Sequence, residues 1–404
     1  MAARAAFRIM GGVDDDANVL DFPQAPDAIE LRHLRAFVAV AEELNFGRAA
    51  DRLHITQSAL SRQIRSLEQL MGCELLRRST HRVELTIAGE ALLDRTRPVL
   101  REVDAAVSAA QSVGGELEGR VARHWAPVIQ ALADEADIQE WRAAYEEMHA
   151  QFDPPPEIQV RPANANGVPS LVVATEPDQP PTLLYLHGGG YVLGSAFGYR
   201  PLVGALSVAA GAGALVPDYR LAPEHPFPAA LDDAVASYRW LLDRGVEAGR
   251  LVVAGCSSGG GLTLSLLLAL KERDLPLPGA AILFCPFVDM SQDIGENEVG
   301  RQAAEAYLAG HPADDPLVAP LRADLSGLPP LLVQAATGDR WLADAKALAN
   351  RARRQGVDAR LELYSIDAHV FQYFWPFLPE ASEAVEAAGR FARERSPARQ
   401  SRSA

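Results

Sequence analysis

Gly255-Cys256-Ser257-Ser258-Gly259 is the stretch of this sequence that decides its fold. The apolar run Leu251–Ala254 comes directly before it, and the helical pattern Gly261–Leu270 follows it. A strand, a sharp turn and a helix around Gly-x-Ser-x-Gly expose the serine hydroxyl, which can then act as a nucleophile. Ser257 stands between the two glycines, whereas choosing Ser258 would put the bulkier cysteine at the first glycine position. Ser257 is therefore the predicted nucleophile.

Two other short apolar runs, Leu183–Leu186 and Gly213–Pro217, predict further strands of a parallel sheet. The first run ends in a glycine-rich turn whose amides can stabilise the negative oxygen that develops when a carbonyl is attacked. The amide after the nucleophile is expected to join them. The predicted oxyanion hole draws on the N–H of Ser258 and on two amides of the turn, for which Gly188, Gly189 and Gly190 are the candidates.

The base and the acid are sought after the nucleophile, because on such a turn the acid and then the histidine follow the serine in the chain. Only His311 and His369 follow Ser257. His369 comes after the strand-like run Leu361–Ile366 and is the predicted base, whereas His311 lies in a polar connection and is expected at the surface.

The acid is predicted from a strand that ends near it. The run Leu331–Gln334 leads to Asp339, at the carboxyl edge of the sheet where active sites collect. Asp339 would orient His369 and stabilise its cation. Asp344, one helical turn further on, and Asp367 remain as alternatives.

These residues resemble the hormone-sensitive-lipase-like family of α/β-hydrolases, which includes bacterial esterases and monoterpene lactone hydrolases. The resemblance covers roughly residues 121–395 and implies an α/β-hydrolase fold: a doubly wound, mostly parallel sheet with a small helical cap. The family elbow usually reads Gly-Asp-Ser-Ala-Gly, so Cys256 and Ser258 are departures. The resemblance also implies that one further set of residues braces the site: His187, Asp218, Arg220 and Glu224.

The N-terminal part carries a different pattern. Ile55-Thr56-Gln57 opens a helix whose inward face holds Leu60, Ile64 and Leu67. From residue 56 to residue 82 there are five arginines against two glutamates, within a chain of net charge −15. A polar, basic outer face suits the major groove of DNA. The predicted base-reading residues are Gln57, Ser58, Ser61, Arg62 and Arg65.

Residues 31 to about 100 resemble the winged helix-turn-helix of LysR-type transcriptional regulators. The resemblance rests on Phe46–Ala50, on Thr56–Ile64 and on the wing that follows. It implies an all-α winged helix-turn-helix and a homodimer that pairs through the long helix of about residues 88–112. The wing arginines Arg77, Arg78 and Arg82 are expected to clamp the DNA backbone, since phosphate contacts dominate affinity.

Both patterns together predict a multidomain chain. Three widely spaced cysteines argue against a disulfide framework and a zinc site, and no residue pattern implies a metal or cofactor. No signal peptide or membrane span is expected, so the protein is predicted to be cytoplasmic. The predicted segments are a mobile extension (1–29), a DNA-binding domain (30–88), a linker helix and hinge (89–120), a hydrolase domain (121–397) and a tail (398–404).

Two functions follow as hypotheses. The first is a carboxylic-ester or lactone hydrolase with a Ser257–His369–Asp339 triad, fused to a domain that binds double-stranded DNA. The second is a transcriptional regulator in which the hydrolase fold serves as the ligand-sensing domain. The two are compatible, because hydrolysis of the ligand could reset a switch.

Overall fold

The computed structural model describes residues 29–78, 83–113, 116–133, 137–176, 178, 180–291 and 298–395. Its contacts divide the chain into two compact units, 1–104 and 105–404. The predicted tail and all but the last residue of the predicted extension lie outside the described residues. No helix in the described ranges is both long enough and apolar enough to cross a membrane.

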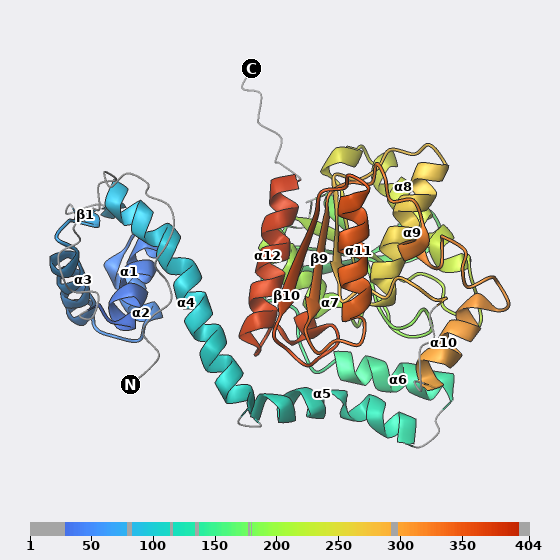
Figure 1. Ribbon diagram of the computed structural model, residues 1–404, viewed down its shortest axis with the longest axis horizontal. Helices are drawn as coiled ribbons and strands as arrows, with labels where there is room; N and C mark the ends of the chain where they lie inside the picture. The colour runs from blue at the N-terminus through green and yellow to red at the C-terminus, as the bar shows by residue number, and fades with distance from the viewer. Residues whose placement is uncertain are drawn as a thin grey trace, which may run out of the picture. The chain divides into compact units, whose positions relative to one another are not determined.

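The N-terminal unit is a bundle of helices with a two-stranded wing (Figure 1). Its core is made by the inward faces of α1 and α3, where Phe37, Leu60 and Ile64 are fully buried. The Thr56 hydroxyl caps α3 by accepting the Ala59 N–H at 3.2 Å. The elements are α1 (Leu31–Glu43), α2 (Phe46–Arg52), α3 (Gln57–Met71), β1 (Leu76–Arg78), β2 (Val83–Leu85) and α4 (Ile87–Val113).

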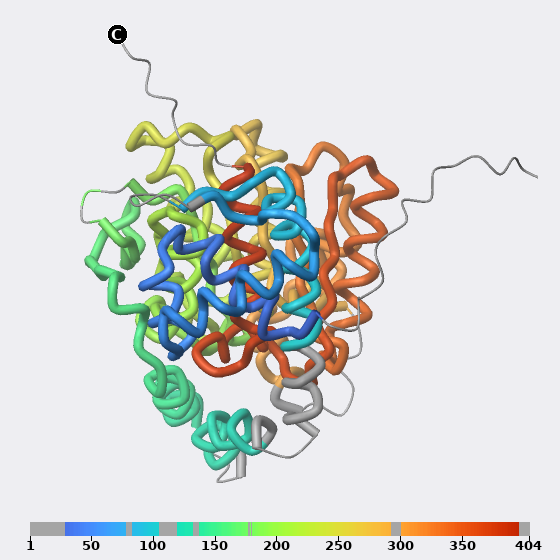
Figure 2. The backbone as a smooth tube through the Cα atoms, turned by 90° about the vertical axis from the view of Figure 1, so that its left-hand side faces the viewer, coloured from blue at the N-terminus to red at the C-terminus, as the bar shows by residue number. Residues whose placement is uncertain are grey.

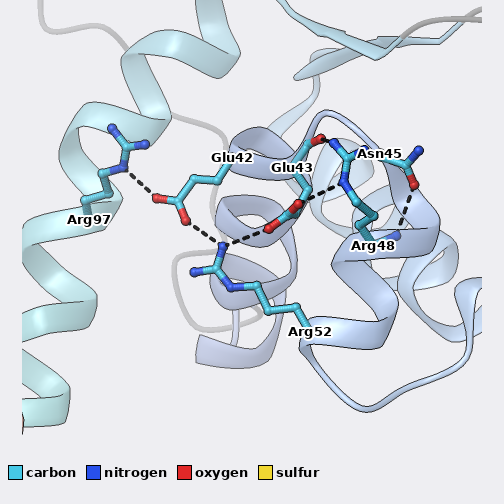
Figure 3. A network of polar contacts seen from close by, with 6 residues as sticks. All are labelled: Glu42, Glu43, Asn45, Arg48, Arg52 and Arg97. Carbon is cyan, nitrogen blue, oxygen red and sulfur yellow. Dashed lines mark hydrogen bonds and ion pairs between the residues drawn. The ribbon is translucent and has the colours of Figure 1, made fainter. Parts of the chain in front are cut away.

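A network of ion pairs joins the first half of α4 to the helix-turn-helix, as Figure 3 shows. The Glu42 carboxylate on α1 accepts from Arg97 of α4 at 3.0 Å and from Arg52 of α2 at 2.8 Å. Its neighbour Glu43 accepts from Arg48 at 3.1 Å. An isolated exposed ion pair contributes little to stability, but the Glu42 carboxylate, which two arginines share, connects three helices in one network.

Two helices precede the sheet of the hydrolase unit. The predicted boundary at residue 120 falls inside helix α5 (Glu116–Ala133), and the contact-based division lies between Asp104 and Ala105. Helix α6 (Ile138–His149) follows α5, and the two lie side by side beyond one end of the sheet (Figures 1 and 2). Val121, Trp125 and Val128 of α5 pack on the core of the hydrolase unit.

An eight-stranded sheet forms the centre of the hydrolase unit, in the order β10-β9-β8-β7-β5-β6-β4-β3. Only the pairs β3–β4 and β4–β6 are antiparallel. The strands are β3 (Gln159–Ala165), β4 (Val168–Ala174), β5 (Pro181–Leu186), β6 (Gly213–Pro217), β7 (Val252–Cys256), β8 (Ala280–Phe284), β9 (Leu331–Ala336) and β10 (Ala359–Tyr364).

Helices cover both faces of this sheet, which makes it doubly wound (Figure 1). Helices α7 and α12 pack together on one face, while α8 and α9 pack together on the other. The helices are α7 (Arg200–Ala210), α8 (Ala229–Asp243), α9 (Ser258–Glu272), α10 (Glu298–Leu308), α11 (Leu342–Arg354) and α12 (Pro379–Arg395). Since both faces are covered, the central strands are fully buried and read as continuous apolar runs.

The strand register sets the position of the site. Leu186, the last residue of β5, lies opposite Gly255 of β7, and Cys256 lies opposite Phe284 of β8. The glycine turn after β5 and the elbow after β7 therefore leave the same edge of the sheet as neighbours.

Candidate active site

The elbow at Ser257 is a tight backbone turn between β7 and α9. Ser257 has φ 52° and ψ −122°, a conformation that side-chain-bearing residues rarely adopt. Glycines surround it because the backbones touch. A Cβ atom on Gly255 would lie 2.2 Å from the Gly259 carbonyl oxygen, and one on Gly259 would lie 2.1 Å from the Leu186 carbonyl oxygen.

The structure brings Ser257, His369 and Asp339 together. The Ser257 Oγ lies 2.8 Å from His369 Nε2, and the Asp339 Oδ2 lies 2.8 Å from His369 Nδ1. A carboxylate only accepts hydrogen bonds, so Nδ1 carries the proton and Nε2 is left to accept the serine hydroxyl. This is the tautomer that can take a proton from Ser257.

Asp339 is held ionised in a buried position. Burial by itself raises the pKa of its carboxyl, but the hydrogen bond and charge of His369 outweigh burial and leave the pKa below its usual value. Its other oxygen, Oδ1, accepts the N–H of Trp341 at 2.8 Å. The buried thiol of Cys285 lies beside the pair, with the three donor atoms within 4.8 Å of one another.

The alternative residues make other contacts. Asp344 is buried in the first turn of α11. Asp367 packs on Gly338, so that a Cβ atom added to Gly338 would lie 2.4 Å from the Asp367 Oδ1. Within the described residues, Asp339 is the carboxylate that reaches His369. His311 bonds to Asp315 at 2.8 Å and is only half-buried.

The predicted oxyanion turn differs from expectation at one amide. The Gly190 N–H, predicted to point at the substrate oxygen, instead donates to the Ser258 hydroxyl at 2.9 Å. The Gly189 and Ser258 N–H groups make no hydrogen bond within the part of the chain that the structure describes. The backbone of Gly188 hydrogen-bonds to the buried Cys256 thiol. The available donors are therefore those of Gly189 and Ser258.

His187, the first residue of this turn, is held in place by packing against Tyr219. Its buried ring stacks on Tyr219 with centroids 4.1 Å apart, and burial lowers its pKa. The Tyr219 hydroxyl donates to the His187 carbonyl at 2.7 Å. The neutral ring therefore acts as a packing group and places no charge near the nucleophile.

The segment after β6 connects the turn to the surrounding helices. Asp218 accepts the Ala196 N–H at 2.7 Å, and Arg220 pairs with Asp233 at 2.7 Å. Glu224 pairs with Arg142 of α6 at 2.7 Å. The last contact fixes α6 beside the site.

A cavity of about 520 Å³ opens beside Ser257 and His369. Helices α5 and α6 supply one wall of it, which no sequence motif indicated. The amphipathic spacing of Trp125, Val128 and Ile129 is the only signal that pointed to an inward face there. The wall residues from these two helices are His124, Trp125, Val128, Ile129, Trp141, Tyr145, Met148 and His149.

The predicted DNA-reading face lies on α3. Gln57, Ser58, Arg62 and Arg65 are exposed and Ser61 is half-buried, while the opposite side of the helix packs into the core. Arg77 in β1 is exposed as well. Two of the predicted backbone clamps, the side chain of Arg78 and the whole of Arg82, lie outside the described residues.

Comparison with known proteins agrees with this architecture. Residues 31–90 match the family described as bacterial regulatory helix-turn-helix protein, lysR family, and residues 183–373 match the alpha/beta hydrolase fold family. The chain therefore belongs to the α/β-hydrolases of the hormone-sensitive-lipase-like type and carries a LysR-type helix-turn-helix at its N-terminus.

The similar proteins include an acetyl-hydrolase and an esterase. An acetyl-hydrolase of Streptomyces hygroscopicus is 43% identical over 225 residues, covering 52% of this chain and 75% of the relative. An esterase of Acinetobacter venetianus is 31% identical over 264 residues, covering 62% and 87%.

Solved structures give the same result. A bacterial hormone-sensitive-lipase-family esterase is 40% identical with a TM-score of 0.62, covering 64% of this chain and 92% of that chain. The esterase EstE5, soaked with p-nitrophenyl butyrate, is 38% identical with a TM-score of 0.61, covering 65% and 92%. The hydrolase unit thus corresponds to nearly the whole length of these enzymes.

Proposed function

We propose that the protein hydrolyses carboxylic esters or lactones through Ser257, His369 and Asp339. Ser257 attacks the carbonyl carbon while His369 Nε2 accepts its proton, and Asp339 stabilises the imidazolium. The oxyanion accepts hydrogen bonds from the Gly189 and Ser258 amides. His369 then returns the proton to the leaving alcohol, and water activated by the same base hydrolyses the acyl-enzyme to the free acid.

The single observation that carries this proposal is the pair of 2.8 Å contacts that His369 makes, one on each ring nitrogen. Hydrolysis of p-nitrophenyl butyrate by the full-length protein and by Ser257→Ala tests it. The wild type should release p-nitrophenol and the variant should lose this turnover. Equal turnover in both proteins would refute the assignment of the nucleophile.

We also propose that the N-terminal unit binds double-stranded DNA as a dimer in the cytoplasm. The exposed polar face of α3 supports the DNA contact, and the exposed apolar side chains Ile87 and Val99 on α4 support pairing through that helix. The domain limits 30–88 and 89–120 are part of this proposal. Fluorescence anisotropy with labelled upstream DNA tests it, because even non-specific binding should survive at low salt. Absence of binding there would overturn it.

One observation favours the second function, ligand sensing. Helix α5, which follows α4 with two residues between them, supplies Trp125 and Val128 to the cavity wall. A ligand in the cavity therefore contacts the segment that leads to the DNA-binding unit. Coupling requires that the ligand binds two conformations with different affinity. A phosphonate that modifies Ser257 should then change the Kd for DNA, and an unchanged Kd would refute sensing.

A further inference from the structure

The cavity beside the nucleophile is lined by several polar side chains that the hydrolytic mechanism does not use, and His149 is the one among them with an acceptor nitrogen that borders the open space. His149, the last residue of α6, lines the cavity and is only 2% exposed. The rings of Tyr145, Tyr199 and Tyr373 surround it, with centroids 4.4 to 4.6 Å from its own. Burial lowers the pKa of His149 to about 3, so its imidazole is neutral.

The tautomer of His149 follows from its one hydrogen bond. Its Nδ1 lies 2.7 Å from the carbonyl oxygen of Tyr145, in the last turn of α6. A carbonyl oxygen has no proton to give, so Nδ1 donates and carries the ring proton. The other nitrogen, Nε2, is consequently a bare acceptor.

No donor within the described residues satisfies Nε2. The Tyr145 and Tyr199 hydroxyls share one hydrogen bond at 3.0 Å, Tyr199 also bonds to the Cys256 thiol, and Tyr373 donates to the His149 carbonyl at 3.1 Å. Nε2 is not among the fully covered unpaired side-chain atoms of the described residues, so it borders the open cavity. An unpaired acceptor in the wall of a binding cavity is satisfied when the ligand brings a donor.

We infer that His149 Nε2 accepts a hydrogen bond from the substrate, and that the preferred substrates are esters with a hydroxyl group on the part that fills the cavity. The inference rests on the proposed ester hydrolase function and makes His149 a residue that determines specificity. An acceptor discriminates sharply: a hydroxyl can donate to it, whereas a methoxy group of similar shape cannot.

His124 provides a matched comparison within the same cavity wall. Its ring stacks on Phe152 at 4.7 Å, and both ring nitrogens are buried without a hydrogen-bond partner. Gln151 donates to the backbone carbonyl of His124 at 3.0 Å and lies beside its ring. Because neighbouring atoms cover both nitrogens, His124 serves as an aromatic packing group, and His124→Phe should leave specificity unchanged.

The test compares kcat/KM for hydroxy esters, their methoxy counterparts and plain esters, with acid release followed in a pH-stat. One arm varies the acyl side with methyl 3-hydroxybutanoate, 6-hydroxyhexanoate and 8-hydroxyoctanoate. The other arm varies the alcohol side with butanoate esters of diols. The two arms show which end of the substrate occupies the cavity.

Wild type should prefer the hydroxy ester over the methoxy ester by about two- to ten-fold in one arm, the range expected for one net hydrogen bond. His149→Phe should bring this ratio to about one, and His149→Gln, which keeps an acceptor oxygen, should retain part of it. His124→Phe should keep the wild-type ratio. Turnover of plain esters by the variants shows that they fold and tests the hydrolase function separately.

The inference is overturned if wild type shows no such preference in either arm. It is also overturned if His149→Phe keeps the preference, or if His124→Phe is the variant that loses it. Loss of plain-ester hydrolysis in wild type would instead refute the proposed function.

Discussion

The backbone N–H of Gly190 donates a hydrogen bond of 2.9 Å to the hydroxyl of Ser258. This contact ties the glycine turn after β5 to the first residue of α9, next to the nucleophile. It exists because a serine stands where the resembled family usually has alanine. The hydroxyl therefore positions the turn that carries the Gly189 amide.

Ser258→Ala should lower kcat by about two- to ten-fold with little change in KM, because one net hydrogen bond that holds the turn is lost. Steady-state kinetics on p-nitrophenyl butyrate measures this effect. Ser265→Ala is the control, since that hydroxyl lies on the same helix but bonds to Gly261. A Ser258→Ala enzyme with wild-type kcat would show that the tie is dispensable.

Asp339→Asn should reduce kcat by roughly 10⁴-fold, as expected when the acid of a Ser-His-Asp triad becomes an amide. An asparagine amide can donate to Nδ1, which moves the ring proton to Nε2 and prevents acceptance from Ser257. Asp344→Asn is the matched control and should stay within a few-fold of wild type. The reverse result would make Asp344 the acid.

The same carboxylate links stability to pH. The folded-state pKa of Asp339 lies below its unfolded value, so its stabilisation is present above the unfolded pKa, near 3.9, and is lost as pH falls through the folded pKa. Urea unfolding at pH 7 and at successively lower pH should show wild type and Asp339→Asn converging in stability. A gap independent of pH would contradict this linkage.

Ser257→Gly should stabilise the fold while abolishing turnover. The positive φ of Ser257 costs a side-chain-bearing residue about 1–3 kcal/mol, and glycine adopts it without that cost. Ser257→Ala removes the same hydroxyl and keeps the strain, so it is the comparison. Urea unfolding should place the glycine variant above the alanine variant, and equal stabilities would argue against a strained elbow.

Tyr185→Phe should be close to neutral, because the buried Tyr185 hydroxyl meets only the Cys256 thiol, a weak hydrogen-bond partner, among the described residues. The residue lies near Cys256, which replaces the aspartate usual in the family elbow. Tyr219→Phe is the opposite case, since that hydroxyl donates to His187 at 2.7 Å, and it should cost about 1 kcal/mol. Thermal unfolding of the two variants should show a shift for Tyr219→Phe only.

Arg62→Ala and Arg65→Ala should each weaken DNA binding. Where the arginine contacts a phosphate, the slope of log K against log salt should fall by about 1; where it reads a base, affinity should fall mainly for the preferred sequence. Anisotropy over a salt series separates these effects. Arg353→Ala, on α11 of the hydrolase unit, is the control and should bind DNA as wild type does.

Much of this architecture could be predicted from the sequence because its signals are local. The elbow motif lies between a strand and a helix that the residues themselves indicate, and Asp339 follows its strand directly. The β5–β7 register then brings the glycine turn to the elbow, as a parallel sheet requires.

The cavity wall could not be predicted in the same way. The tautomer and the position of the His149 ring are set by the Tyr145 carbonyl and by three tyrosine rings. These contacts depend on how α6 packs. The engagement of the Gly190 amide likewise depends on a side chain 68 positions away. The boundary near residue 120 is predicted from a glycine-containing polar stretch, whereas the packing of helix α5, which contains that residue, depends on tertiary contacts.

The close packing of the backbone at Gly255 and Gly259 limits which substitutions the elbow can accept. With carbonyl oxygens 2.1 to 2.2 Å from where a Cβ would stand, neither position can acquire a side chain without dismantling the turn. Substitutions in the α5 and α6 wall, in contrast, leave the reacting atoms in place. A library for new substrate ranges should therefore randomise that wall and leave the elbow untouched.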